Sequence, residues 1–209
     1  MWPWPKCVAS RAWPMARPPR PRHPTVAIVM ARILLCTSAS AALYKACDLA
    51  SQLTQAGHEV PVLLTPSAAQ LVSPQQFEAV TGQPSRVHEL GEDRLGAMDH
   101  IDFARGLAAV VVAPCTAALA GRIAMGLATD LVTTTLMAVP LGVPRLVCPA
   151  MNPHMLAQPA VARNLAQMVE DGWERMEPEV GHMACGEDGP GRLADPDLIT
   201  QRLLEILSA

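Results

Sequence analysis

Small and hydroxyl-bearing residues are gathered in the segment 37–45, which reads Thr-Ser-Ala-Ser-Ala-Ala-Leu-Tyr-Lys. A segment of this kind, placed between a strand and a helix, brings backbone N–H groups and hydroxyls to the helix N-terminus, where they can hold a phosphate. The same residues also suit an ordinary serine cap, in which the hydroxyl satisfies the helix and binds no ligand. The sequence alone leaves both interpretations open.

Two further segments each carry one polar side chain of chemical interest. His100 stands five residues before Arg105, and an imidazole can act as a base near neutral pH, although a lone histidine is more often structural. Asn152 lies within Pro149–Met155 and directly precedes Pro153. A helix cap followed by proline at the first helical position accounts for that pair without any chemistry.

Cys185 is surrounded by glycines in the segment 181–192. This composition predicts a mobile loop, and mobile loops close over active sites. A surface loop with an accidental cysteine is the alternative. A metal site formed by His154, His182 and Cys185 is disfavoured, because a glycine-rich loop gives its ligands poor support. No metal ion is expected.

The segments are connected by alternating strand-like and helix-like patterns. Continuous apolar runs predict strands buried on both faces, at 32–36, 58–65, 107–113 and 145–148. Helical spacing of apolar residues occurs at 41–56, at about 116–127 and at 196–207. The alternation predicts a single α/β domain, with a three-layer, doubly wound parallel sheet of the Rossmann or flavodoxin-like type.

In a doubly wound sheet, ligands bind beyond the carboxyl ends of the strands. The segments expected at that edge are 37–40, 65–67, 114–118 and 149–155, and all four are rich in Ser, Thr, Ala and Pro. The glycine-rich fingerprints of dinucleotide and nucleoside-triphosphate sites are missing. The sequence therefore predicts a site built from hydroxyls and backbone N–H groups.

Composition and charge exclude several classes of function. The net charge is −3 and only 17% of residues are charged, so no clustered basic surface is expected for nucleic acid. The apolar run 106–121 is too short to span a bilayer and contains Pro114, so no membrane insertion is expected. Six cysteines without a disulfide-type spacing indicate free thiols in a reducing compartment, the cytoplasm.

Residues 1–29 differ in composition from the rest of the chain. They hold seven of the twenty prolines and several arginines, but no acidic residue. Proline at this density is incompatible with a helix or a central strand. The segment is expected to be a disordered tail, or the product of a start codon assigned too early, with arginine-rich targeting as the alternative. The folded domain is expected at 30–209.

Taken together and in this order, the motifs resemble the homo-oligomeric flavin-containing cysteine decarboxylases, with the phosphopantothenoylcysteine decarboxylases as the nearest branch. The resemblance covers about 32–196. It rests on these pieces: Ser40–Lys45, His100 with Arg105, Ala113-Pro114-x-Thr116-Ala117, Leu131–Leu136, Pro149-Ala150-Met151-Asn152-x-x-Met155, and Ala184-Cys185-Gly186 followed by Gly189-x-Gly191-Arg192.

The resemblance implies FMN bound between subunits of a homotrimer or dodecamer, and conversion of 4'-phosphopantothenoylcysteine to 4'-phosphopantetheine in coenzyme A synthesis. It makes His100 the base, Asn152 the ligand of the substrate carboxylate and Cys185 the residue of the last step. Arg105, Met151 and Ala184 would contact the substrate. The residues that it places at the flavin are Ala39, Ser40, Ala41, Thr65, Ser67, Thr116, Ala117 and Ala150.

Four positions depart from the family pattern. Ala118 and Leu119 replace Asn and Thr, Leu156 replaces Trp, and Ala39 replaces the Gly before Ser40. The effect on flavin and substrate binding is left open. A peptidyl-cysteine decarboxylase of lanthipeptide maturation is the nearest rival, but that branch typically lacks the reducing cysteine. A flavin-binding regulatory relative without catalysis is the other alternative, and such relatives usually lose the histidine or the cysteine.

Overall fold

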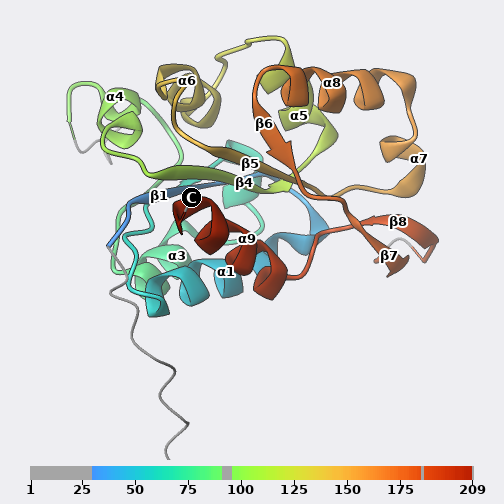
Figure 1. Ribbon diagram of the computed structural model, residues 1–209, viewed down its shortest axis with the longest axis horizontal. Coiled ribbons are helices and arrows are strands. Elements are labelled where there is room, and N and C mark those ends of the chain that lie inside the picture. The colour runs from blue at the N-terminus through green and yellow to red at the C-terminus, as the bar shows by residue number, and fades with distance from the viewer. Residues whose placement is uncertain (1–29, 91–95, 185, 209) are drawn as a thin grey trace, which may run out of the picture.

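The protein is built around a six-stranded parallel sheet with helices on both faces (Figure 1). The computed structural model describes residues 30–90, 96–184 and 186–208. The strands of the sheet are β1 (Ile33–Thr37), β2 (Val62–Leu64), β3 (Ser85–Arg86), β4 (Ala109–Cys115), β5 (Arg145–Pro149) and β6 (Trp173–Arg175). Their order across the sheet is β3-β2-β1-β4-β5-β6. The order reverses between β1 and β4, so the predicted doubly wound parallel sheet is confirmed.

The helices form two layers around this sheet (Figure 1). One layer contains α1 (Tyr44–Gln55), α3 (Pro74–Thr81) and α9 (Pro196–Ser208). The other contains α4 (Asp99–Ala104), α5 (Ala117–Ala124), α6 (Leu131–Ala138) and α8 (Pro159–Glu170). Three short helices complete the described chain: η1 (Ala41–Leu43), α2 (Pro66–Ala69) and α7 (Pro153–Leu156).

The pleat of β1 divides the core between the two layers. Ile33 and Leu35 join the core on the side of α1 and α9, while Leu34 and Cys36 join the core on the side of α5, α6 and α8. All four side chains are completely buried. A strand without polar alternation is therefore covered on both faces, as its continuous apolar run predicts.

Two predicted elements are shorter than the patterns that indicate them. The run 58–65 forms a strand only over Val62–Leu64, preceded by one isolated bridge between Arg32 and Glu59. Pro61 accepts a hydrogen bond from Leu35 but has no N–H to donate, so regular pairing begins after it. Helix α5 ends at Ala124 rather than near residue 127.

The expected loop at 181–192 is the main correction to the sequence-based fold. Its two arms are paired as an antiparallel hairpin of β7 (Glu179–His182) and β8 (Asp188–Arg192). Glycines at 189 and 191 adopt φ of 158° and 143°, backbone conformations that other residues rarely adopt. The glycines therefore shape a strand instead of a loop.

The predicted tail at 1–29 lies outside the described residues, and so does Cys185. Within the described part of the chain, every helix is too short or too polar to cross a lipid bilayer.

Candidate active site

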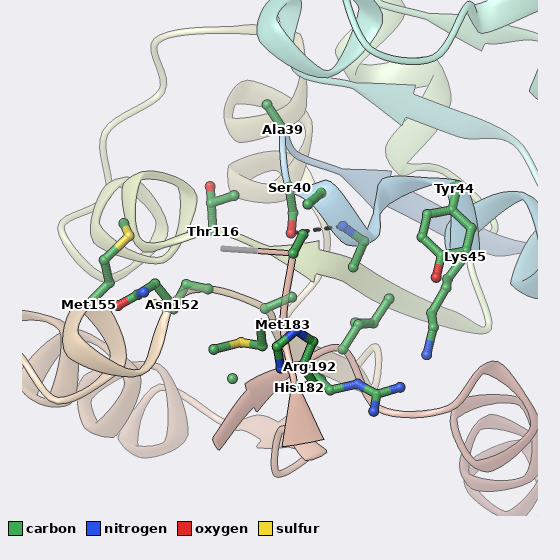
Figure 2. Close-up of a pocket in the computed structure, with 17 residues that line it drawn as sticks. Ala39, Ser40, Tyr44, Lys45, Thr116, Asn152, Met155, His182, Met183 and Arg192 are labelled. Carbon is green, nitrogen blue, oxygen red and sulfur yellow. Dashed lines mark hydrogen bonds between the residues drawn. The ribbon is translucent and has the colours of Figure 1, made fainter. Parts of the chain in front are cut away.

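A pocket of about 440 Å³ opens at the carboxyl edge of the sheet, where the strand order reverses (Figure 2). Its walls come from the turns after β1, β4 and β5 and from the β7–β8 hairpin. The structure brings eight of the sequence-predicted site residues to this pocket: Ala39, Ser40, Ala41, Thr116, Ala150, Met151, Asn152 and Ala184.

Ser38 holds the turn after β1 against the turn after β4. Its buried hydroxyl donates to the Pro114 carbonyl over 2.8 Å and accepts from the Thr116 N–H over 2.9 Å. These bonds join two segments that are 76 and 78 residues apart in the chain. Sequence reasoning gave Ser38 no role of its own, because the pairing depends on the adjacency of β1 and β4.

Ser40 and Thr116 each cap a helix while lining the pocket. The Ser40 Oγ accepts from the Ala42 N–H over 3.3 Å (dashed in Figure 2), and the Thr116 Oγ1 accepts from the Leu119 N–H over 3.4 Å. In both bonds the hydroxyl is the acceptor, so its own hydrogen remains available for donation. The cap and the ligand site, which are alternatives at the level of sequence, are compatible in the same side chain.

Asn152 occupies the pocket wall at the end of β5 and caps α7. Its Oδ1 accepts from the His154 N–H over 2.8 Å, with Pro153 at the first helical position. Its Nδ2 donates to the Glu187 carboxylate. The neighbouring Met151 is buried, and its N–H donates to the Gly191 carbonyl over 3.0 Å. Asn152 is therefore held by its own helix and by the hairpin.

The charged groups around the pocket favour an anionic ligand. Lys45 and Arg192 line it, and the described lining contains no Asp or Glu. The nearest acidic partner of Arg192 is Glu179, at 4.0 Å. The sequence motifs include Lys45 without indicating a role for it, and Arg192 reaches the pocket because the hairpin forms. The alternation of glycine with larger residues along 188–192 is the sequence signal that could have predicted the strand, and with it the position of Arg192.

Five predicted site residues lie away from the described lining of the pocket. Thr65 and Ser67 follow β2 at the same edge of the sheet, and Ala117 begins α5 behind Thr116. His100 and Arg105 belong to the segment that leads into the amino end of β4, at the opposite edge of the sheet (Figure 1). A single chain therefore does not bring the predicted base to the predicted carboxylate ligand.

His100 has a carboxylate neighbour at that opposite edge. Its Nδ1 lies against the Glu89 carboxylate, and its side chain is 23% exposed. The Arg105 guanidinium pairs with Asp102 over 3.2 Å and is largely exposed. His100 and Arg105 thus lie on the segment around α4, outside the described lining of the pocket of their own chain.

Three other cysteines lie in the sheet itself and can be set aside as catalytic thiols. Cys36, Cys115 and Cys148 are buried and free. Burial raises the pKa of the Cys115 thiol to about 12, and it raises the pKa of Cys36 and Cys148 as well. Such thiols stay protonated at neutral pH and behave as small apolar side chains.

The residues that depart from the family pattern around α5 and α7 differ in how deeply they are buried. Leu119 is completely buried in the core beneath α5, whereas Ala118 is exposed on the first turn of that helix. Leu156 is partly buried against the same core. A leucine at 119 therefore adds apolar packing where a threonine would bring a hydroxyl.

Comparison with protein families and curated proteins identifies the family to which this chain belongs. The flavoprotein family model matches residues 23–208, and the chain belongs to that family. It is 42% identical over 169 residues to the coenzyme A biosynthesis bifunctional protein CoaBC of Bacillus subtilis, covering 81% of this chain but only 41% of that protein. It is 36% identical over 176 residues to a probable phosphopantothenoylcysteine decarboxylase of Streptococcus mutans, covering 84% of this chain and 98% of that protein.

Solved structures agree with the sequence relatives. A PPC decarboxylase mutant complexed with pantothenoylaminoethenethiol matches with a TM-score of 0.75 at 27% identity, over 87% of this chain and 100% of that chain. The FMN-dependent cysteine decarboxylase SpaF matches with a TM-score of 0.72 at 28% identity, over 86% and 98%. The resemblance to flavin-containing cysteine decarboxylases is therefore confirmed.

Proposed function

We propose that residues 30–209 form an FMN-dependent decarboxylase that converts 4'-phosphopantothenoylcysteine to 4'-phosphopantetheine in coenzyme A biosynthesis. The observation that carries this proposal is the position of Asn152 in the wall of a pocket whose described lining contains no Asp or Glu and includes Ser40 and Thr116. Relatives at 36% and 42% identity with names from this pathway support the choice of substrate.

The donors of the pocket fit a flavin mononucleotide. The hydroxyls of Ser40 and Thr116, at two helix N-termini, suit the phosphate. Ala39, Ala41 and Ala150 leave the walls flat and apolar, as a ring system requires. When bound, FMN supplies reversible two-electron oxidation of the substrate's cysteine side chain, which makes loss of CO2 feasible.

The chain's own residues bind the carboxylate and move protons. The Asn152 amide holds the carboxylate without a fixed positive charge, which would oppose the departure of CO2. His100 removes a proton from the cysteine side chain, since an imidazole is suited to proton transfer near neutral pH. Cys185 gives a proton to the product in the last step, and the two electrons that bound FMN would have taken up would be returned to the product at the same time, so the overall reaction would be redox-neutral. Arg105 and Ala184 contact the substrate.

The separation of His100 from the pocket supports a site shared between subunits, in a homotrimer or a dodecamer. Exposed apolar side chains surround the helices near His100: Leu90 (77% exposed), Met98 (54%), Met137 (51%) and Leu141 (89%). Contact with a neighbouring subunit would cover them and bring His100 to that subunit's pocket. The free thiols of the described chain are typical of a reducing compartment, and we assign the enzyme to the cytoplasm.

Product analysis tests the proposed function directly. The purified protein is expected to be yellow, to release FMN on denaturation and to convert 4'-phosphopantothenoylcysteine to the saturated thiol, as measured by mass spectrometry. A protein that remains colourless after reconstitution with FMN would contradict the proposal. Release of the unsaturated ene-thiol instead would favour the peptide-modifying branch, and bound flavin without turnover would favour a regulatory role.

A further inference from the structure

Strand β8 presents one face to the segment that contains Asn152. The N–H of Met151 donates to the Gly191 carbonyl over 3.0 Å, and a Cβ at Gly191 would lie 2.0 Å from the Met151 carbonyl oxygen. A Cβ at Gly189 would lie 2.9 Å from the Pro153 ring. Residues 187, 189 and 191 are the less exposed positions along this stretch, because side chains alternate between the faces of a strand.

Glu187 extends this contact to the Asn152 side chain. One carboxylate oxygen accepts from the Asn152 Nδ2, and the other lies 3.7 Å from the His154 Nε2. Asn152 and His154 belong to the same turn, at the start of α7. Asn152 lines the pocket whereas Glu187 does not, so the carboxylate holds the amide from outside the described lining.

Two contacts of the Asn152 side chain select opposite ends of its amide group. The terminal amide torsion of asparagine is broad and is not fixed by the backbone. The His154 N–H requires an acceptor and therefore Oδ1, while a carboxylate only accepts and therefore requires Nδ2. A flipped amide would place Oδ1 against the carboxylate and Nδ2 against an N–H group, so both contacts oppose it.

We propose that Glu187 is a positioning residue, which together with the His154 N–H fixes the amide plane of Asn152 and the edge of that amide that faces the carboxylate subsite. The inference deepens the proposed function and rests on it, since it concerns the same carboxylate subsite. Because the amide is planar, one contact at its oxygen and one at its nitrogen fix its whole orientation. The orientation is thus set before substrate binds, which lowers the entropic cost of binding.

Glu187→Gln tests this role with almost no change in shape. A glutamine amide both donates and accepts, so it no longer selects the orientation of Asn152. The matched control is Asp188→Asn, which removes the same charge from the opposite, exposed face of β8, where Asp188 pairs with His182 over 3.2 Å. Each variant is purified with its flavin, and flavin content and Tm are compared with those of the wild type.

The readout compares ligands with and without a carboxylate. Glu187→Gln is expected to lower kcat/KM for 4'-phosphopantothenoylcysteine about tenfold, while the Kd of 4'-phosphopantetheine, which lacks the carboxylate, stays unchanged. Asp188→Asn should leave both values unchanged.

Four outcomes would overturn the assignment. Equal weakening of both ligands would make Glu187 a structural residue of the hairpin, and wild-type values for both would leave it without a role. Tighter binding of the substrate would mean that Glu187 competes for the amide instead of orienting it. A wild-type enzyme that binds flavin but fails to decarboxylate the substrate would overturn the proposed function together with this inference.

Discussion

At the scale of single residues, three polar side chains combine a structural and a ligand-binding role. Ser40, Thr116 and Asn152 each cap a helix with an oxygen that accepts from the backbone. Each also lines the pocket, and the hydroxyls of Ser40 and Thr116 can still donate. For Ser40 and Asn152 the sequence predicts both roles as alternatives but cannot show that they coexist, because that depends on which atom of the side chain the helix uses.

His100 provides the residue-scale prediction. His100→Asn is expected to leave the fold and the flavin content unchanged but to lower kcat by about 10²–10⁴-fold, because a general base is lost. Steady-state turnover and the visible absorbance of the flavin measure the two effects separately. His100 is partly exposed on a six-residue helix, so the substitution leaves no cavity in the core.

Glu89→Gln serves as the companion variant, because it removes only the charge that faces the His100 Nδ1. It should cause a smaller loss of kcat, since the imidazole remains but is less well oriented. Normal turnover in His100→Asn would mean that the family's base does not correspond to this residue.

At the scale of elements, the sequence predicts the central strands well and the hairpin poorly. The runs that form β1, β4 and β5 are continuous and apolar, since both of their faces are covered. The hairpin has no apolar face, and its β8 reads Asp-Gly-Pro-Gly-Arg. Those residues form a strand because they pack against Met151 and Pro153, a tertiary contact that local propensity cannot predict.

Gly191→Ala tests how strongly β8 determines the geometry of the site. Its Cβ would meet the Met151 carbonyl oxygen at 2.0 Å, and a backbone oxygen cannot move aside like a side chain. The strand must shift, so kcat/KM is expected to fall at least tenfold, with a loss of stability of about 1–3 kcal/mol. Thermal unfolding and steady-state kinetics measure both.

Gly126→Ala is the matched control for that variant. Gly126 also has a positive φ, of 65°, but a Cβ there would contact nothing within 4 Å. It should cost about 1 kcal/mol of stability from backbone strain alone, with unchanged kcat/KM. Equal kinetic losses in the two variants would show that the docking of β8 does not govern the site.

At the scale of the whole molecule, the predicted site is divided between two edges of the sheet. The turns that carry Ser40, Thr116 and Asn152 meet at the carboxyl edge, as the rule for doubly wound sheets predicts. His100 and Arg105 lie at the amino edge, where a single chain cannot use them together with the pocket. Sequence motifs indicate which residues take part in the site. Only the fold shows which of them a single chain brings together.

Mixing two inactive variants tests whether the site is shared between subunits. In His100→Asn the pocket is intact, and in Asn152→Asp the base is intact but a like charge repels the substrate carboxylate. Co-expressed with different tags and purified through both, the hybrid trimers are expected to regain up to about a third of wild-type activity, since each hybrid trimer joins an intact pocket to an intact base at one of its three interfaces. Co-expression of two differently tagged copies of His100→Asn is the control, and it should give no recovery. If light scattering shows hybrid oligomers that remain inactive, His100 must act within its own chain or have no part in catalysis, and the shared site would be wrong.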